Sequence, residues 1–265
     1  MQPGIGSFAF GWAVGHATAP LDAQGLLEFA RRHGLFVVQL GDNLPLHEMS
    51  SARLAALVTE AAQSGISLEL GARGLTEAHL ERYLHLCRQC NARVLRFVAD
   101  ASGYEPSACD LRALLANAVP ALDAADVTLA LENHDRLSAR VLRDVVDHVA
   151  SPRVGICLDT ANSLGAGEGL EFVAELLAPV TLNLHVKDVV VTRALHQMGF
   201  VVQGRALGEG QLSLRETIAR VAAAGRCRSV IVESWTSPCA DIDATLALER
   251  AMVERSVETL KGWLA

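Results

Sequence analysis

The strongest constraint on the fold is a repeated unit, in which a short apolar run follows each amphipathic helix pattern. Eight such runs recur, most of them about 30 residues apart. Parallel strands that helices cover are apolar on both faces, so these runs are typical of βα units. The expected strands lie at residues 7–11, 36–40, 66–70, 94–98, 128–132, 155–159, 182–186 and 229–233.

Eight βα units in 265 residues have the size and count of an α/β TIM (β/α)8 barrel. A doubly wound open sheet is the rival, but the chain lacks the G-x-G-x-x-G loop that usually follows an early strand of that fold. No linker or low-complexity segment divides the chain, so we expect one domain over residues 1–265. The long connection at about residues 189–213, which contains VVQGRALGEGQLS, indicates a functional loop.

Composition excludes several classes of protein. A formal net charge of -7 does not attract the negatively charged backbone of a nucleic acid, so we expect no nucleic acid partner. No run of 18 apolar residues exists, so we expect no membrane span, and the N-terminal segment has no basic residue typical of a signal peptide. We therefore expect a cytoplasmic protein. Cys87 and Cys90 form C-x-x-C at the end of a helix pattern, which favours reduced structural thiols.

Four successive expected strands end in polar residues: Glu132, Asp159, His185 and Glu233. Each alone could cap a helix or lie in the core, but the carboxyl ends of barrel strands meet at one rim. Three carboxylates there would repel one another unless a cation or protons neutralised them. Three oxygen ligands and one imidazole suit Mn²⁺, Mg²⁺ or Co²⁺. The sequence therefore predicts one divalent ion, with Mn²⁺ favoured.

Lys187 is one of only two lysines in an arginine-rich chain. It lies two residues after His185, so both side chains share one face of the strand. An ammonium beside the ion would donate a hydrogen bond to a developing oxyanion, and we predict a catalytic role. The alternative is a salt bridge to Asp188 or Glu209 that only shapes the rim.

Four further residues are candidates for binding the substrate. His134 shares a strand face with Glu132, and Trp235 follows the last expected strand and could form a wall of the pocket. Asn162 could reach the site or cap the next helix. Arg205, on the long connection, could bind a carboxylate, a phosphate or a sugar hydroxyl, or could be a solvated surface residue.

The segments LENHD, LDTAN, LHVKD and VIVESW, together with GRALGEG, resemble the metal site of the xylose isomerase-like TIM barrels. That resemblance implies that Glu132, Asp159, His185 and Glu233 bind one metal ion. Ketose 3-epimerases of this superfamily commonly carry a histidine where this chain has Asn162. The runs ENHDR, CLDTANS, HVKD and MGFVVQGRALGEG are also similar to 3-oxo-isoapionate decarboxylases.

The favoured hypothesis is a metal-dependent isomerase or epimerase of a ketose or polyol ketone. The ion would chelate a carbonyl and the adjacent hydroxyl and stabilise an enediolate, while Glu132 and Glu233 move protons. A decarboxylase of a 3-oxo sugar acid would use the same residues. A DNA-repair endonuclease needs more metal ligands and a basic surface, and a sugar-binding barrel without catalysis would not need the ligand set. The expected partner is a small polyhydroxylated sugar or sugar acid, and a homo-oligomer through the C-terminal helix pattern at residues 241–264 stays open.

Overall fold

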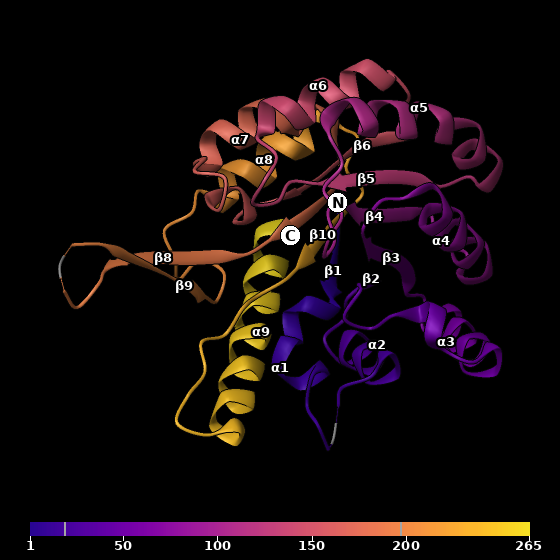
Figure 1. Cartoon of the computed structure of the whole chain (residues 1–265). Coiled ribbons are helices and arrows are strands. Elements are labelled where there is room, and N and C mark those ends of the chain that lie inside the picture. Colours follow the sequence, from indigo (N-terminus) through magenta and orange to yellow (C-terminus); the bar gives the residue numbers. More distant parts are fainter. Residues whose placement is uncertain (19, 197) are drawn as a thin grey trace.

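The computed structural model describes residues 1–18, 20–196 and 198–265 and confirms the TIM barrel (Figure 1). Eight parallel strands close in the order β1-β10-β7-β6-β5-β4-β3-β2, and β1 pairs with both β10 and β2. The barrel strands are β1 (Gln2–Gly6), β2 (Val37–Leu40), β3 (Ser67–Arg73), β4 (Val94–Val98), β5 (Thr128–Glu132), β6 (Val154–Asp159), β7 (Thr181–Val186) and β10 (Ser229–Val232).

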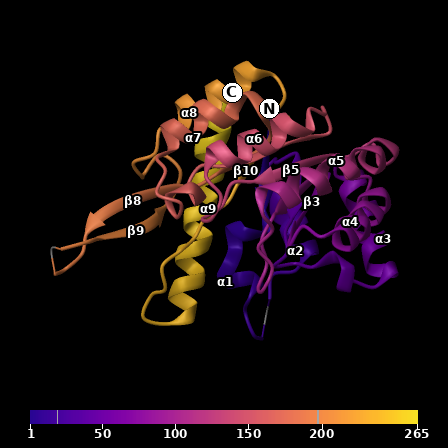
Figure 2. The same cartoon turned by 45° about the horizontal axis from the view of Figure 1, so that its top comes forward.

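Helices surround the barrel, and the long α9 runs along its β1–β10 side, as both views show (Figures 1 and 2). Six of them begin at a side chain that accepts a backbone N–H of the first turn: Asp22, Ser50, Thr76, Ser107, Ser138 and Asp241. The helices are α1 (Gly11–Val14), α2 (Ala23–Arg32), α3 (Ser51–Gln63), α4 (Glu77–Cys90), α5 (Ala108–Ala125), α6 (Ala139–Val149), α7 (Leu170–Leu177), α8 (Leu214–Ala224) and α9 (Ile242–Leu264).

The first expected strand, at residues 7–11, was wrong. The strand is β1, five residues earlier, and a 3₁₀ turn over Ser7–Phe10 with helix α1 follows it. The sequence did not predict β1 because its glycines lack the β-branched side chains by which a strand is recognised. A Cβ at Gly4 would lie 2.7 Å from Ile231 Cδ1 and 2.8 Å from Val37 Cβ, so closure of the barrel between β10 and β2 excludes any larger residue there.

The long connection after β7 is mostly an antiparallel hairpin of β8 (Asp188–Arg193) and β9 (Phe200–Arg205), not an irregular loop. The hairpin projects away from the barrel (Figures 1 and 2). Six of the eleven large exposed hydrophobic side chains in the described part of the chain belong to it. They are Val191, Leu195, Met198, Phe200, Val201 and Val202.

The barrel interior holds a buried polar layer below the carboxyl ends of its strands. Gln39 donates to Glu69 Oε2 (3.0 Å) and to Asn183 Oδ1 (2.9 Å), and Ser229 donates to Glu69 Oε1 (2.6 Å). Burial raises the pKa of Glu69 above its ordinary value, although hydrogen bonds from Ser229 and Gln39 act in the opposite direction. This layer is the floor on which the candidate site stands.

The sequence predicted that no segment of the chain spans a membrane. Within residues 1–18, 20–196 and 198–265, no helix combines the length and apolar character that crossing a membrane requires. A cytoplasmic location stays a prediction.

Cys87 and Cys90 are free, buried thiols in the last turn of α4, and burial raises the pKa of Cys90 to about 11. Such a thiol is a poor nucleophile, which favours the structural interpretation.

Candidate metal centre

The structure brings together the four side chains predicted to bind a metal. His185 Nδ1 lies 3.3 Å from Glu233 Oε1, 3.8 Å from Glu132 Oε2 and 3.9 Å from Asp159 Oδ2. No side chain of the four is more than 2% exposed. They come from the carboxyl ends of β5, β6, β7 and β10. Glu233 directly follows β10, and its backbone N–H donates to Val186 O of β7 (3.1 Å).

Three of these side chains fit a shared ion directly, since ligand atoms of Asp159, His185 and Glu233 all lie within 4.8 Å of one another, whereas Glu132 meets that limit together with His185 and Cys157. Two atoms that each lie about 2.1 Å from one ion are about 3.0 Å apart at a right angle and about 4.2 Å apart in line. Among the buried polar atoms of the described residues, His185 Nδ1 and Asp159 Oδ2 are two of only four without a hydrogen-bond partner. Buried polar atoms in native proteins are normally satisfied, and here charged neighbours take that place: Lys187 Nζ lies 2.9 Å from Asp159 Oδ2, and Glu233 Oε1 lies 3.3 Å from His185 Nδ1.

Two permanent cations partly offset the three carboxylates. Lys187 Nζ lies 2.9 Å from Asp159 Oδ2 and 3.1 Å from Glu233 Oε2, and Arg96 Nε donates to Glu132 Oε2. Burial alone would lower the pKa of Lys187, but Asp159 and Glu233 outweigh it and raise the pKa above its usual value. Lys187 therefore remains an ammonium. The alternative partners considered from the sequence, Asp188 and Glu209, do not pair with it among the described residues.

The same electrostatics act on two of the candidate ligands, His185 and Glu233. Burial would lower the pKa of His185, yet the charges of Glu233 and Glu132 raise it above its ordinary value. Burial would raise the pKa of Glu233, yet His185, Lys187 and Arg96 hold it well below its usual range. Without an added ion, the cluster is thus a network of charges in which the imidazole tends to take up a proton.

Arg96 is a component of the site that sequence reasoning missed. Its side chain is 4% exposed, and besides Glu132 it donates to Asp42 Oδ1 (3.1 Å). The signal was present in the sequence, because a charged residue at the centre of the apolar strand VLRFV must either face a partner inside the barrel or disrupt it.

Two more residues hold the strand ends in place. Asn133 accepts from Asp159 N (2.7 Å) and donates to Asp159 O (2.9 Å), which couples the ends of β5 and β6. Thr160 Oγ1 donates to Lys187 O and accepts from Lys187 N, both at 2.8 Å. These contacts fix the backbone beneath Asp159 and Lys187, so the ligand geometry is built before any ion binds.

Cys157 lies two residues before Asp159 on β6, paired with Glu132 of β5, and offers Sγ within 4.8 Å of ligand atoms of Glu132 and His185. Burial first, and then the charge of Glu132, raise the pKa of this thiol well above its ordinary value. The thiol directs its proton to Asn183 Oδ1 (3.3 Å). Because the thiolate is the metal-binding form, Cys157 belongs to the floor of the site and not to the ligand set.

Comparison with known proteins identifies the family of this barrel. Residues 15–261 match the family described as the xylose isomerase-like TIM barrel. The chain belongs to this family. It is 33% identical over 261 residues to a 3-oxo-isoapionate decarboxylase of Pectobacterium atrosepticum, a match that covers 98% of this chain and 95% of the relative.

Solved structures share the fold at low identity. D-psicose 3-epimerase from Clostridium cellulolyticum H10, solved with D-tagatose, has a TM-score of 0.73 at 16% identity, over 99% of this chain and 98% of that one. A xylose isomerase-like TIM barrel protein from Mycobacterium smegmatis, solved in complex with magnesium, has a TM-score of 0.71 at 14% identity, over 98% and 97% of the two chains.

The residues predicted to bind substrate divide into two groups in this xylose isomerase-like barrel. Asn162 touches the cluster, since its Nδ2 donates to Glu132 Oε1 (2.7 Å) and its Oδ1 accepts from Lys187 Nζ (3.2 Å). His134 instead contacts Arg73 (3.2 Å) and Asp135 (2.6 Å).

Arg205 and Trp235 lie at the base of the hairpin. Arg205 donates to Gly204 O and to Gln203 Oε1, both within β9. Trp235 is 38% exposed, and its backbone lies against Gly204, where a Cβ would come 2.0 Å from Trp235 O. Their contacts in the described chain do not include the four ligands, so their role toward a substrate stays a prediction.

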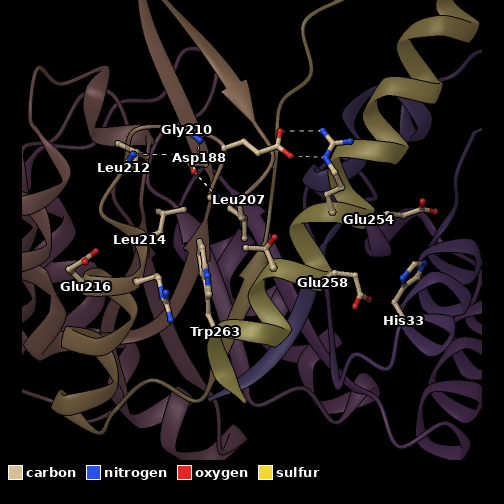
Figure 3. Close-up of a pocket in the computed structure, with 15 residues that line it drawn as sticks. His33, Asp188, Leu207, Gly210, Leu212, Leu214, Glu216, Glu254, Glu258 and Trp263 are labelled. Atoms are coloured by element: carbon tan, nitrogen blue, oxygen red, sulfur yellow. Dashed lines mark hydrogen bonds and ion pairs between the residues drawn. The ribbon is translucent and has the colours of Figure 1, made fainter.

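A cavity of about 950 Å³ lies elsewhere in the fold, and none of the four candidate ligands lines it. It lies between α8, α9 and the segment after β9, with Trp263 in its wall (Figure 3). Asp188 closes one side by accepting from the backbone of Gly208, Gly210 and Leu212. The contact of Asp188 is therefore structural: it holds the glycine-rich segment GEG against the barrel.

Proposed function

We propose that this chain is a divalent-metal-dependent isomerase or epimerase that acts on a ketose or a related polyol ketone through an enediolate. One observation carries the proposal: three buried carboxylates lie 3.3–3.9 Å from one buried imidazole nitrogen, His185 Nδ1, at the carboxyl ends of the barrel strands. A divalent ion held there by Glu132, Asp159, His185 and Glu233 would polarise the substrate carbonyl and adjacent hydroxyl. We propose Mn²⁺, with Mg²⁺ or Co²⁺ as alternatives, because oxygen ligands predominate.

The chain's own residues supply the proton transfers and the charge stabilisation. Glu132 and Glu233 come from strands separated in the barrel by β6 and β7, so they approach a bound substrate from different sides and are assigned to taking and returning the proton. Lys187, which remains an ammonium, is assigned to donating a hydrogen bond to the oxygen on which negative charge develops. Asn162 orients both Glu132 and Lys187.

The substrate expected at this site is a small polyhydroxylated sugar or sugar acid. Besides Asn162, we propose His134, Arg205 and Trp235 as substrate contacts at the rim. His134 and Trp235 are partly exposed, so a substrate could contact their rings. Arg205 has no carboxylate partner in the described chain, so its guanidinium is available to donate to a substrate. A carboxylate on the substrate would suit Arg205.

The decarboxylase relative supports a second candidate, the loss of CO₂ from a 3-oxo sugar acid such as 3-oxo-isoapionate. Breaking the bond to the carboxylate carbon releases CO₂ and leaves the electron pair as an enolate, which a proton then quenches. The same ammonium of Lys187 would stabilise this enolate, so the cluster serves either reaction.

The deciding experiment uses protein reconstituted with Mn²⁺ and the E233Q variant as control. Candidate ketoses are incubated in D₂O, and 3-oxo sugar acids are incubated with detection of CO₂. Deuterium in the recovered ketose supports the isomerase or epimerase, and release of CO₂ supports the decarboxylase. If metal-loaded protein gives neither product with a broad set of substrates, the remaining interpretation is a barrel that binds sugars without catalysis. Absence of bound metal in the wild-type protein would refute the metal centre itself.

A further inference from the structure

His185 has a second, fully buried contact that the proposed reaction does not use. Its Nε2 lies 2.7 Å from Gln39 Oε1, across the barrel interior and 146 residues away in sequence. Gln39 is 2% exposed, in the middle of β2. The imidazole is therefore held between this amide on one side and the carboxylates of the candidate metal centre on the other.

The orientation of the Gln39 amide follows from its neighbours. Its Nε2 donates to Glu69 Oε2 (3.0 Å) and to Asn183 Oδ1 (2.9 Å), so both amide protons are used. Asn183 is itself oriented, because its Nδ2 donates to Glu69 Oε2 (3.0 Å) and to Ser229 Oγ (2.8 Å). A reversed Gln39 amide would turn its oxygen toward two acceptors, and that arrangement is unfavourable in a buried layer.

The remaining polar atom of the amide, Gln39 Oε1, can only accept a hydrogen bond, so His185 must carry a proton on Nε2. In the neutral imidazole the lone pair then lies on Nδ1, the atom surrounded by Glu132, Asp159 and Glu233. We propose that Gln39 is a positioning residue: it selects the His185 tautomer, and the ring orientation, in which Nδ1 is available to a divalent ion. The proposal rests on the metal-dependent function proposed above.

The physical expectation is a loss of metal affinity when the acceptor is removed. Without Gln39 Oε1, Nε2 would be a buried donor with no partner, and the ring would gain by placing its proton on Nδ1 beside Glu233. That tautomer blocks the lone pair that binds the ion. Partners that orient a metal-binding histidine typically contribute about 10–100-fold to metal affinity.

The test compares Q39M and S229A with the wild-type protein. Q39M keeps the length of the side chain but removes the acceptor. S229A is the matched control: it removes hydrogen bonds to Glu69 and from Asn183 in the same buried layer, but it touches neither Gln39 nor His185. Circular dichroism confirms that each variant folds, and calorimetric titration with Mn²⁺ gives the dissociation constant.

We expect Q39M to bind Mn²⁺ about 10–100-fold more weakly, and S229A to stay within about threefold of wild type. In Mg²⁺-loaded, ¹⁵N-histidine-labelled wild type, His185 should show a directly bonded proton on Nε2 only. A wild-type proton on Nδ1, or a folded Q39M with unchanged affinity, would overturn the positioning role while leaving the metal site intact. A wild-type protein that binds no divalent ion would instead refute the metal-dependent function.

Discussion

The change R96M offers the sharpest test of the electrostatics of the site. Arg96 is 4% exposed and its partner Glu132 is 1% exposed, so the pair is fully removed from water. Substitution by methionine would leave the Glu132 carboxylate with a single donor, Asn162 Nδ2. Breaking a buried ion pair by removing one partner costs about 3–5 kcal/mol. For a chain of this length each kcal/mol lowers the melting temperature by roughly 2–4 °C, so R96M should melt roughly 6–20 °C below wild type.

The assay is thermal unfolding in EDTA, followed by circular dichroism. The matched control is R93M, which removes an ion pair to Asp126 in which both side chains are about 60% exposed. Such a pair contributes about 0–1 kcal/mol. Because a divalent ion would also supply positive charge to Glu132, excess Mn²⁺ should restore part of the loss in R96M. The double change R96M/E132Q should be less destabilised than R96M alone.

A single result would refute this reasoning. If R96M in EDTA melted within about 3 °C of R93M, the guanidinium would not be the buried counter-charge of Glu132. The carboxylate would then have to be neutralised by a proton or lie in water. If the double variant were no more stable than R96M, the two side chains would not be coupled, and the contact would not explain the loss.

Further predictions concern activity, acid stability and assembly. E132Q and E233Q should each abolish turnover while circular dichroism stays that of wild type; a variant that retains near-normal rate removes its residue from the mechanism. Since the pKa of Glu233 is held below its ordinary 4.5, its stabilising contribution in metal-free protein is present above that pH and is lost as pH falls further, so E233Q should flatten the acid side of the unfolding free energy against pH. If a homo-oligomer forms, we expect the exposed hairpin to be its interface, so V202S should lower the mass seen by light scattering while L248S, on α9, should not; the opposite pattern would place the interface on the helix.

The repeated βα pattern predicted the barrel because its signal is local. Seven of the eight expected strands lie on a strand of the structure, since apolar runs such as residues 94–98 and 128–132 need only their own composition to be recognised. The first strand and the hairpin were missed for opposite reasons. Gly4 and Gly6 carry no strand signal although closure demands them, and the strands of the hairpin lie within a connection whose glycines resemble those of a loop.

By itself the sequence determined which residues end the strands, and therefore that Glu132, Asp159, His185 and Glu233 share one rim. Only the tertiary structure decided how they are held. Arg96 and Gln39 sit in the middle of apolar strands, and their partners are 36 and 146 residues away. The Arg96–Glu132 pair depends on the register of the neighbouring strands β4 and β5. The Gln39–His185 pair depends on closure of the barrel, which places β2 and β7 across one interior although two other strands separate them. Local periodicity predicts on which face of a strand a side chain lies, whereas the arrangement of the strands in the closed barrel determines which side chain it contacts.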